Sequence, residues 1–208
     1  MRNTIILLAA IHCLGLVAEE EQDVEPPHEY YIEIGDKKVD VESGKPFKLD
    51  VSKDQELVLK QKPDRLFNRA GISFRFPQET SYEHKNEQLP LWTLKYKHSV
   101  VIIQVFKNQV PEAIFPVFLK GLEVQYKNQA KFSDASETLG SVVLTGKTVE
   151  PNIVLTAKLV QSVFPLKMGD DTVVILIQHT RRPDGTLYPE SDAMVKLLKA
   201  TFKVDEKK

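Results

Sequence analysis

The sequence predicts an α+β fold in which an antiparallel β-sheet packs with helices, preceded by a small β-rich unit near the N-terminus. Two patterns support this prediction. Short segments of alternating apolar and polar residues recur between turn residues, and helical spacing of apolar residues occurs twice in the second half of the chain. A chain of 208 residues, of which 42% are hydrophobic, is long enough for one well-buried core and short for two. We therefore expect one main domain.

The first 18 residues have the layout of a secretory signal peptide. Arg2 precedes an apolar run over residues 5–17, and the small residue Ala18 stands where cleavage would occur. The run is shorter than the roughly 20 apolar residues that span a bilayer. We predict that residues 1–18 are removed, that the mature chain begins at Glu19, and that no transmembrane segment remains. A retained anchor and a lipid attached to Cys13 are the alternatives.

Cysteine usage indicates the compartment. Cys13 is the only cysteine, so the predicted mature chain has no thiol, which excludes disulfides, thiol catalysis and cysteine metal sites. The sequence also contains no Asn-x-Ser/Thr acceptor for N-glycosylation. Secreted eukaryotic domains of this size usually carry disulfides. These absences favour an exported protein of the bacterial periplasm or another extracytoplasmic space.

Residues 19–29 precede the predicted fold. They are acidic, contain Pro26 and Pro27 and have almost nothing to bury, so we expect a disordered, solvated leader. Residues 30–62 then form the small β-unit. Its predicted strands, separated by turn residues, are 30–34, 38–41, 47–51 and 56–61.

The main domain is predicted over residues 70–204, after a break at Pro63. Its first half contains three strands and a helix. The strands are residues 71–77, 91–96 and 100–106, of which the last two form a hairpin. Apolar residues at every fourth position predict a helix that ends near residue 128, with Pro116 in its first turn.

The second half of the domain begins with a polar loop over residues 133–138. Three strands follow, at 141–149, 153–163 and 172–178, with connections short enough for antiparallel pairing. The unbroken apolar run 173–177 predicts a central strand, with Ile175 and Leu176 on opposite, covered faces. A helix that starts near residue 189 or 191 and a short strand over 201–204 close the chain.

Several of these features occur together in one known fold. They are the segment from Gly71 to Pro77, the hairpin that bears Trp92, one helix, a three-strand meander, and the closing helix and strand. In this combination residues 70–204 resemble the PsbP-like fold, an α/β/α sandwich. Its members include photosystem accessory subunits, a Ran-binding nuclear protein and bacterial periplasmic proteins of the DcrB kind. The resemblance implies a non-catalytic binding or assembly role, because such proteins mostly dock on partners.

No motif in the sequence supplies a catalytic constellation. Gly146-Lys147-Thr148 has the ending of a phosphate loop, but Gly140 leaves five residues in a gap that needs four, and the residues between them are strand-like. Glycine spacing for a serine nucleophile elbow is missing. The histidines of the predicted mature chain, none at a metal-ligand spacing, are His28, His84, His98 and His179. We expect no catalytic residue, cofactor or resident metal.

Four cations form the candidate site. Lys95 and Lys97 alternate with apolar residues along one predicted strand, and Arg181 and Arg182 share a turn. If the two pairs lie close together, they form a docking patch for an anionic partner; separate, solvated surface charges are the alternative. The net charge of −1 and the scattered basic residues argue against nucleic-acid binding.

The sequence therefore predicts a non-catalytic binding or accessory protein of the bacterial cell envelope, with a protein of that envelope as its partner. Two other functions remain open. A small-molecule or lipid carrier would need a connected apolar cavity of several hundred Å3, on the order of known ligand pockets. A periplasmic hydrolase would need convergent polar groups with perturbed pKa values in a cleft.

Overall fold

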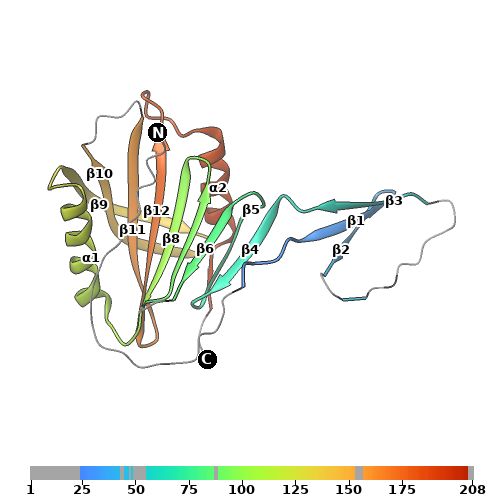
Figure 1. Cartoon of the computed structure of the whole chain (residues 1–208), viewed down its shortest axis with the longest axis horizontal. Helices are drawn as coiled ribbons and strands as arrows, with labels where there is room; N and C mark the ends of the chain where they lie inside the picture. Colours follow the sequence, from blue (N-terminus) through green and yellow to red (C-terminus); the bar gives the residue numbers. More distant parts are fainter. Residues whose placement is uncertain are drawn as a thin grey trace.

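A computed structural model describes residues 24–42, 45–46, 48, 55–86, 89–152 and 157–205. Within these residues lie thirteen strands and two helices, arranged in one seven-stranded and two three-stranded sheets. Figure 1 shows a layered body, which contains the large sheet and both helices, and a small β-sheet that projects from it as an arm. The fold class predicted from the sequence, an α+β protein with a small N-terminal β-unit, is confirmed.

The large sheet is antiparallel throughout, in the order β6-β7-β8-β12-β11-β10-β9. The strands, in chain order, are β6 (Ser81–Lys85), β7 (Leu91–Tyr96), β8 (Ser99–Phe106), β9 (Ala130–Leu139), β10 (Val142–Pro151), β11 (Lys158–Met168) and β12 (Asp171–Arg181). Ile175 on the central strand β12 pairs with Ile103 on β8 and with Phe164 on β11. The unbroken apolar run of β12 thus has a neighbouring strand on each side.

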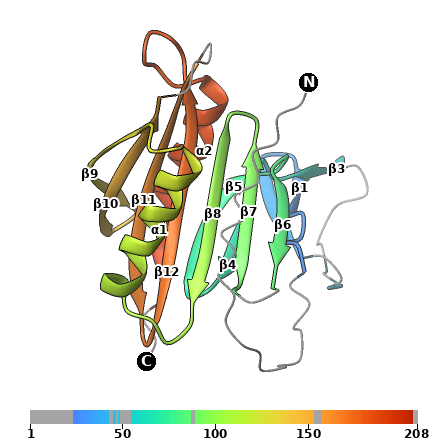
Figure 2. The same ribbon diagram turned by 60° about the vertical axis from the view of Figure 1, so that its left-hand side comes forward.

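Different elements cover the two faces of the large sheet. Helix α1 (Pro111–Gln125) lies on one face, over β11 and β12. Helix α2 (Pro189–Thr201) and a small sheet of order β13-β5-β4 lie on the other (Figure 2). Ile175 and Leu176 are both fully buried and belong to separate clusters on these two faces. The prediction that β12 is covered on both sides is therefore confirmed.

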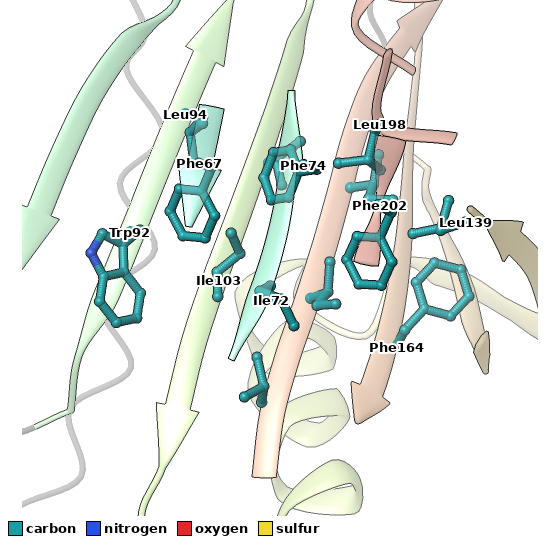
Figure 3. Close-up of a cluster of buried hydrophobic side chains, with 14 of the residues drawn as sticks. Phe67, Ile72, Phe74, Trp92, Leu94, Ile103, Leu139, Phe164, Leu198 and Phe202 are labelled. Atoms are coloured by element: carbon teal, nitrogen blue, oxygen red, sulfur yellow. The ribbon is translucent and has the colours of Figure 1, made fainter. Parts of the chain in front are cut away.

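The core between the large sheet and the second layer is rich in aromatic rings (Figure 3). The small sheet consists of β4 (Asp64–Arg69), β5 (Ile72–Pro77) and β13 (Lys203–Val204). Phe67 stacks on Phe74 at 4.9 Å between ring centroids and meets Trp92 edge-on at 6.1 Å. Phe202, directly after α2, stacks on Phe74 at 6.3 Å. Burial of such rings, with their preferred geometries, contributes a large share of the stability of a core.

Several predicted elements need correction. The residues 133–138, expected as a polar loop, belong to strand β9, which pairs with β10 along its whole length. As an edge strand β9 fully buries only Leu139, so it lacks the apolar signal of an inner strand. Strands β4 and β6 were not predicted, and β11 continues through Pro165 to Met168. Helix α1 begins at Pro111, so Pro116 lies inside the helix and not in its first turn.

The arm is a three-stranded sheet of order β2-β1-β3, formed by β1 (Tyr30–Ile34), β2 (Lys37–Val41) and β3 (Leu57–Gln61). Ile32, Val39 and Leu59 occupy one row across it. On the other face Glu33 forms ion pairs with Lys38 and Lys60. These strands match three of those predicted within residues 30–62. Of the fourth, 47–51, all but residue 48 lies outside the described residues. Among the helices of the described residues, none is long and apolar enough to cross a membrane.

Candidate functional site

Two connections meet at one end of the large sheet, the β7–β8 turn and the loop between β12 and α2 (Figures 1 and 2). The register brings them together: Ser99 pairs with His179, and the Thr180 N–H donates to the carbonyl of His98 at 3.0 Å. Lys97 turns the chain with a φ of 47°, in the left-handed region. The β12–α2 loop closes on itself through a hydrogen bond of 2.8 Å from the Arg182 N–H to the Thr186 carbonyl.

Aromatic rings hold the side chains at this end. The His98 ring stacks on Tyr188 at 4.2 Å, and the Arg182 guanidinium lies 5.3 Å from the centre of the same tyrosine ring. The Lys97 ammonium lies 5.4 Å from the centre of the Tyr96 ring. A cation over an aromatic face is attracted by the ring quadrupole, by about 0.5 to 1 kcal/mol at exposed sites. Both cations are therefore held in place as well as exposed.

The structure brings three of the four predicted cations, Lys97, Arg181 and Arg182, to the same end of the sheet. Lys95 is two residues back along β7 and forms an ion pair of 2.7 Å with Glu83 on β6. Lys158 was not predicted: it is the first residue of β11, is exposed, and pairs directly with Arg181. We call Lys97, Lys158, Arg181 and Arg182 the cationic end.

The electrostatics of the cationic end favour negative charge. Like charges directly opposite each other in a sheet are destabilising, and Lys158 and Arg181 stand in that relation. Asp184, in the adjacent loop, accepts hydrogen bonds from the Thr186 hydroxyl at 2.7 Å and from its N–H at 2.9 Å. These bonds, and then the charge of Arg182, lower the pKa of Asp184. Both bonds are accepted by Oδ1, and the carboxylate keeps its negative charge near Arg182.

A buried polar cluster lies beneath α2, next to the cationic end. His179 is 9% exposed, its Nε2 accepts from the Arg181 Nε–H at 3.4 Å, and its Nδ1 has no partner. Burial, and then the charge of Arg181, lower the pKa of His179 from 6.5 to about 4. The buried hydroxyls of Ser99 and Ser191 also have no partner. The sequence does not predict the pairing of His179 with Ser99 because they lie far apart in the chain, on β12 and β8.

The cluster does not have the geometry of a nucleophile and its base. Those groups need hydrogen-bond distance, about 2.6 to 3.2 Å. Within the described residues, the ring of His179 makes its hydrogen bond with Arg181 and none with a serine hydroxyl. The adjoining cavity has a volume of about 30 Å3, enough for a water molecule and far below the roughly 300 to 1,000 Å3 of small-molecule sites. Its lining residues include Ser162, Glu137 and Lys199.

The Gly146-Lys147-Thr148 motif belongs to a strand and makes contacts with the neighbouring strands. Gly146 lies in β10, where a Cβ atom would come within 1.9 Å of the Val163 carbonyl oxygen, and Lys147 forms an ion pair of 2.7 Å with Asp134. These contacts belong to the pairing of β10 with its neighbours. No group of three or more potential metal ligands occurs in the part of the chain that the structure describes.

Comparisons with known proteins bear on the fold. No protein-family model and no curated protein sequence matches the chain. Among solved structures, the chain is similar to the Saccharomyces cerevisiae Ran-binding protein Mog1p, at 10% identity over 69% of this chain and 96% of that one, with a TM-score of 0.45. A point mutant of protein Mog1 matches equally well, at 10% identity, 69% and 97% coverage and a TM-score of 0.45.

A third match is the cyanobacterial PsbP (CyanoP) of Synechocystis sp. PCC 6803. It is 9% identical over 68% of this chain and 92% of that one, with a TM-score of 0.42. These matches agree with the predicted resemblance to the PsbP-like fold, as distant likenesses of fold. Likeness at this level says nothing about what the chain binds.

Proposed function

We propose that this protein is an exported, non-catalytic binding or accessory protein of the bacterial cell envelope, which docks on an anionic surface of a partner protein through its cationic end. The observation that carries the proposal is the direct pairing of Lys158 with Arg181, next to the exposed cations Lys97 and Arg182. Sheet pairing alone makes that arrangement unfavourable. A negatively charged partner turns the cost into an attraction.

The side chains of the cationic end suit protein recognition. Arginine and tyrosine are enriched among the residues that contribute most to binding energy at interfaces. Here Tyr188 contacts both His98 and Arg182. Because this contact already restricts the arginine side chain, binding a partner costs less side-chain entropy. Lys95, which is paired with Glu83, is left out of the proposed surface.

The two alternative functions have weaker support. A carrier needs a pocket for its cargo, and the cavity beneath α2, at about 30 Å3, is too small for one. A hydrolase is favoured by the lowered pKa of His179, but this ring has Arg181 as its hydrogen-bond partner and, within the described residues, makes no hydrogen bond with a serine hydroxyl. Binding through the cationic end needs neither a pocket nor a nucleophile.

The first test identifies the partner and measures its binding. Protein purified from its native envelope is analysed by mass spectrometry for what comes with it, and the affinity for that partner is measured in 0.1 M and 1 M salt. Affinity should fall as salt rises, because the screening length shortens from about 10 Å to about 3 Å. Reversing Lys97 and Arg182 to Glu should weaken binding roughly tenfold, since rim charges steer association.

The matched control reverses Lys85, the last residue of β6, and Lys107, the residue after β8. Both are exposed and lie at the end of the sheet away from the cationic end. This variant has the same net charge as the first, so it should bind nearly as wild type if location matters. Equal loss in both variants, or binding indifferent to salt, would remove the cationic end from consideration. Turnover of a generic ester, phosphate or glycoside that follows the purified protein would favour the hydrolase instead.

A further inference from the structure

The segment that precedes the arm is attached to the body. Residues 19–23 lie outside the described residues, but residues 24–29, which we expected to be a solvated leader, follow the outer edge of the small sheet β13-β5-β4. Strand β4 is the edge strand there. Val24 and Pro26 each offer a carbonyl oxygen to an arginine of β4, Arg69 at 3.1 Å and Arg65 at 3.1 Å.

Arg65 is the centre of this attachment. It is 1% exposed, although arginine is almost never fully buried without partners. Its Nη1 donates to the Glu25 carboxylate at 2.6 Å and its Nη2 to the Thr80 carbonyl at 2.5 Å, and its guanidinium lies 5.0 Å from the centre of the Phe76 ring. The buried Nε–H has no partner. Glu25 supplies the only carboxylate that reaches this guanidinium among the described residues.

The leader fits the edge in shape as well as charge. Pro26 is buried against the body, and proline has no N–H that burial would leave unsatisfied. Proline also holds the chain extended before folding, which reduces the entropy that docking costs. Further on, Glu29 forms ion pairs with Arg75 and Lys62, both at 3.1 Å. The leader is thus held by one carboxylate at each end of a short proline segment.

Glu29 has a backbone hydrogen bond, accepted by its carbonyl from the Lys62 N–H at 2.8 Å, which continues the pairing of β1 with β3. Residues 24–26, in contrast, contact β4 only through the arginine side chains of that strand. None of the described strands includes residues 24–26, so this part of the leader can leave β4 without unpairing any strand. The Glu25 side chain remains 53% exposed while Arg65 beneath it is 2% exposed. The Glu25 carboxylate thus lies at the surface, above a buried guanidinium.

We propose that the edge of β4 around Arg65 is a peptide-binding site, filled in this structure by the chain's own leader, which accepts an acidic, proline-containing extended segment of a partner protein when the leader is displaced. The partner segment needs the same chemistry as the leader that it replaces. Its carboxylate binds Arg65, as Glu25 does, and its proline takes the place of Pro26. The site is separate from the cationic end and does not depend on the function proposed for it.

The test supplies the segment in trans to the full chain. A variant with Glu25→Gly, Pro26→Ser and Pro27→Gly keeps the chain length and Glu29 but removes the carboxylate that meets Arg65 and both prolines. A synthetic peptide of residues 24–29 is titrated into this variant and into the wild-type chain by calorimetry. We expect saturable binding to the variant and none to the wild type, where the tethered leader acts as a competitor at about millimolar effective concentration.

Two control peptides separate recognition from general attraction. Replacing Glu25 with Gln in the peptide should weaken binding at least tenfold, and a scrambled peptide of the same composition should not bind. Equal affinity for all three, or no binding to a variant that retains the Trp92 fluorescence of the folded core, overturns the proposal. If the triple variant fails to fold, the full chain with Glu25→Gln is used. Millimolar peptide should raise its melting temperature, and an unchanged value overturns the proposal.

Discussion

His179 determines part of how the stability of this protein depends on pH. Its ring is 9% exposed beneath α2, and burial, then the charge of Arg181, lower its pKa from 6.5 to about 4. In the unfolded chain the ring is protonated below about pH 6.5, whereas in the folded protein it stays neutral down to about pH 4. Between these values the unfolded state binds more protons than the folded state, so the free energy of unfolding falls as the pH is lowered. At pH 4 the loss amounts to about 3 kcal/mol.

The His179→Gln variant removes this contribution, although it loses some packing at every pH. Urea unfolding of both proteins at pH 7, 6, 5 and 4 gives the difference in their free energies of unfolding, in which the titration of the carboxylates cancels. That difference should shrink by about 3 kcal/mol from pH 7 to pH 4, because only the wild type loses stability through this ring. Ser162→Ala, at the same cavity, should give a difference that does not change with pH. A constant difference for His179→Gln as well would refute the argument.

The remaining predictions concern the core, two glycines and the N-terminus. Ile175→Ala and Leu176→Ala should each lower the free energy of unfolding by about 2 to 5 kcal/mol, measured by urea unfolding, because each side chain is fully buried on a different face of β12; a loss below about 1 kcal/mol would mean that one face is open. Gly140→Ala should cost about 2 kcal/mol or more, since Gly140 has a φ of +57° and a Cβ atom would lie 2.0 Å from the carbonyl oxygen of the residue after α2. Gly121→Ala, in open space on α1, should be neutral or stabilise by up to about 1 kcal/mol. Protein taken from the envelope should begin at Glu19 by N-terminal sequencing, and an intact Met1 or a lipid on Cys13 would contradict the signal-peptide prediction.

The elements that the sequence predicts well are those whose pattern is local. The alternation of residues 71–77 and the run 173–177 depend only on which faces of a strand are covered, and both strands lie inside a sheet. Helix α2 likewise follows from its spacing and from the proline at its start, Pro189. In each case the information is contained within about a dozen residues.

Edge strands lack such a pattern. Residues 130–139 show one fully buried apolar side chain in ten, because β9 covers the core only at Leu139, and its polar side chains are typical of a loop. Its strand conformation comes from pairing with β10, which supplies the hydrogen bonds that its own composition does not predict. β6, at the other edge of the same sheet, was missed for the same reason.

The cationic end could be predicted from the sequence only in part. A strand pattern indicates which side of a strand Lys95 and Lys97 occupy, but not what lies across from them. Glu83 on the unpredicted β6 takes up Lys95, and the register of β11 with β12 brings Lys158 opposite Arg181. Which cations remain available therefore depends on strand pairing. The sequence predicts the two connections that carry Lys97, Arg181 and Arg182. The strand pairing decides that Lys158 joins them and that Lys95 does not.

The leader site depends most strongly on contacts between distant residues. In the alternation of β4, Arg65 occupies an inward position between Asp64 and Leu66, where a charge argues against a buried strand. Its charge is tolerated there because Glu25, 40 residues earlier, and the Thr80 carbonyl, 15 residues later, meet it in space. The same pairing explains why an acidic, proline-bearing segment with little to bury is nonetheless held against the body. An inward arginine on an edge strand and an acidic leader are each common features. Here they indicate a binding site for an acidic segment, because the buried guanidinium of Arg65 needs a carboxylate as its partner.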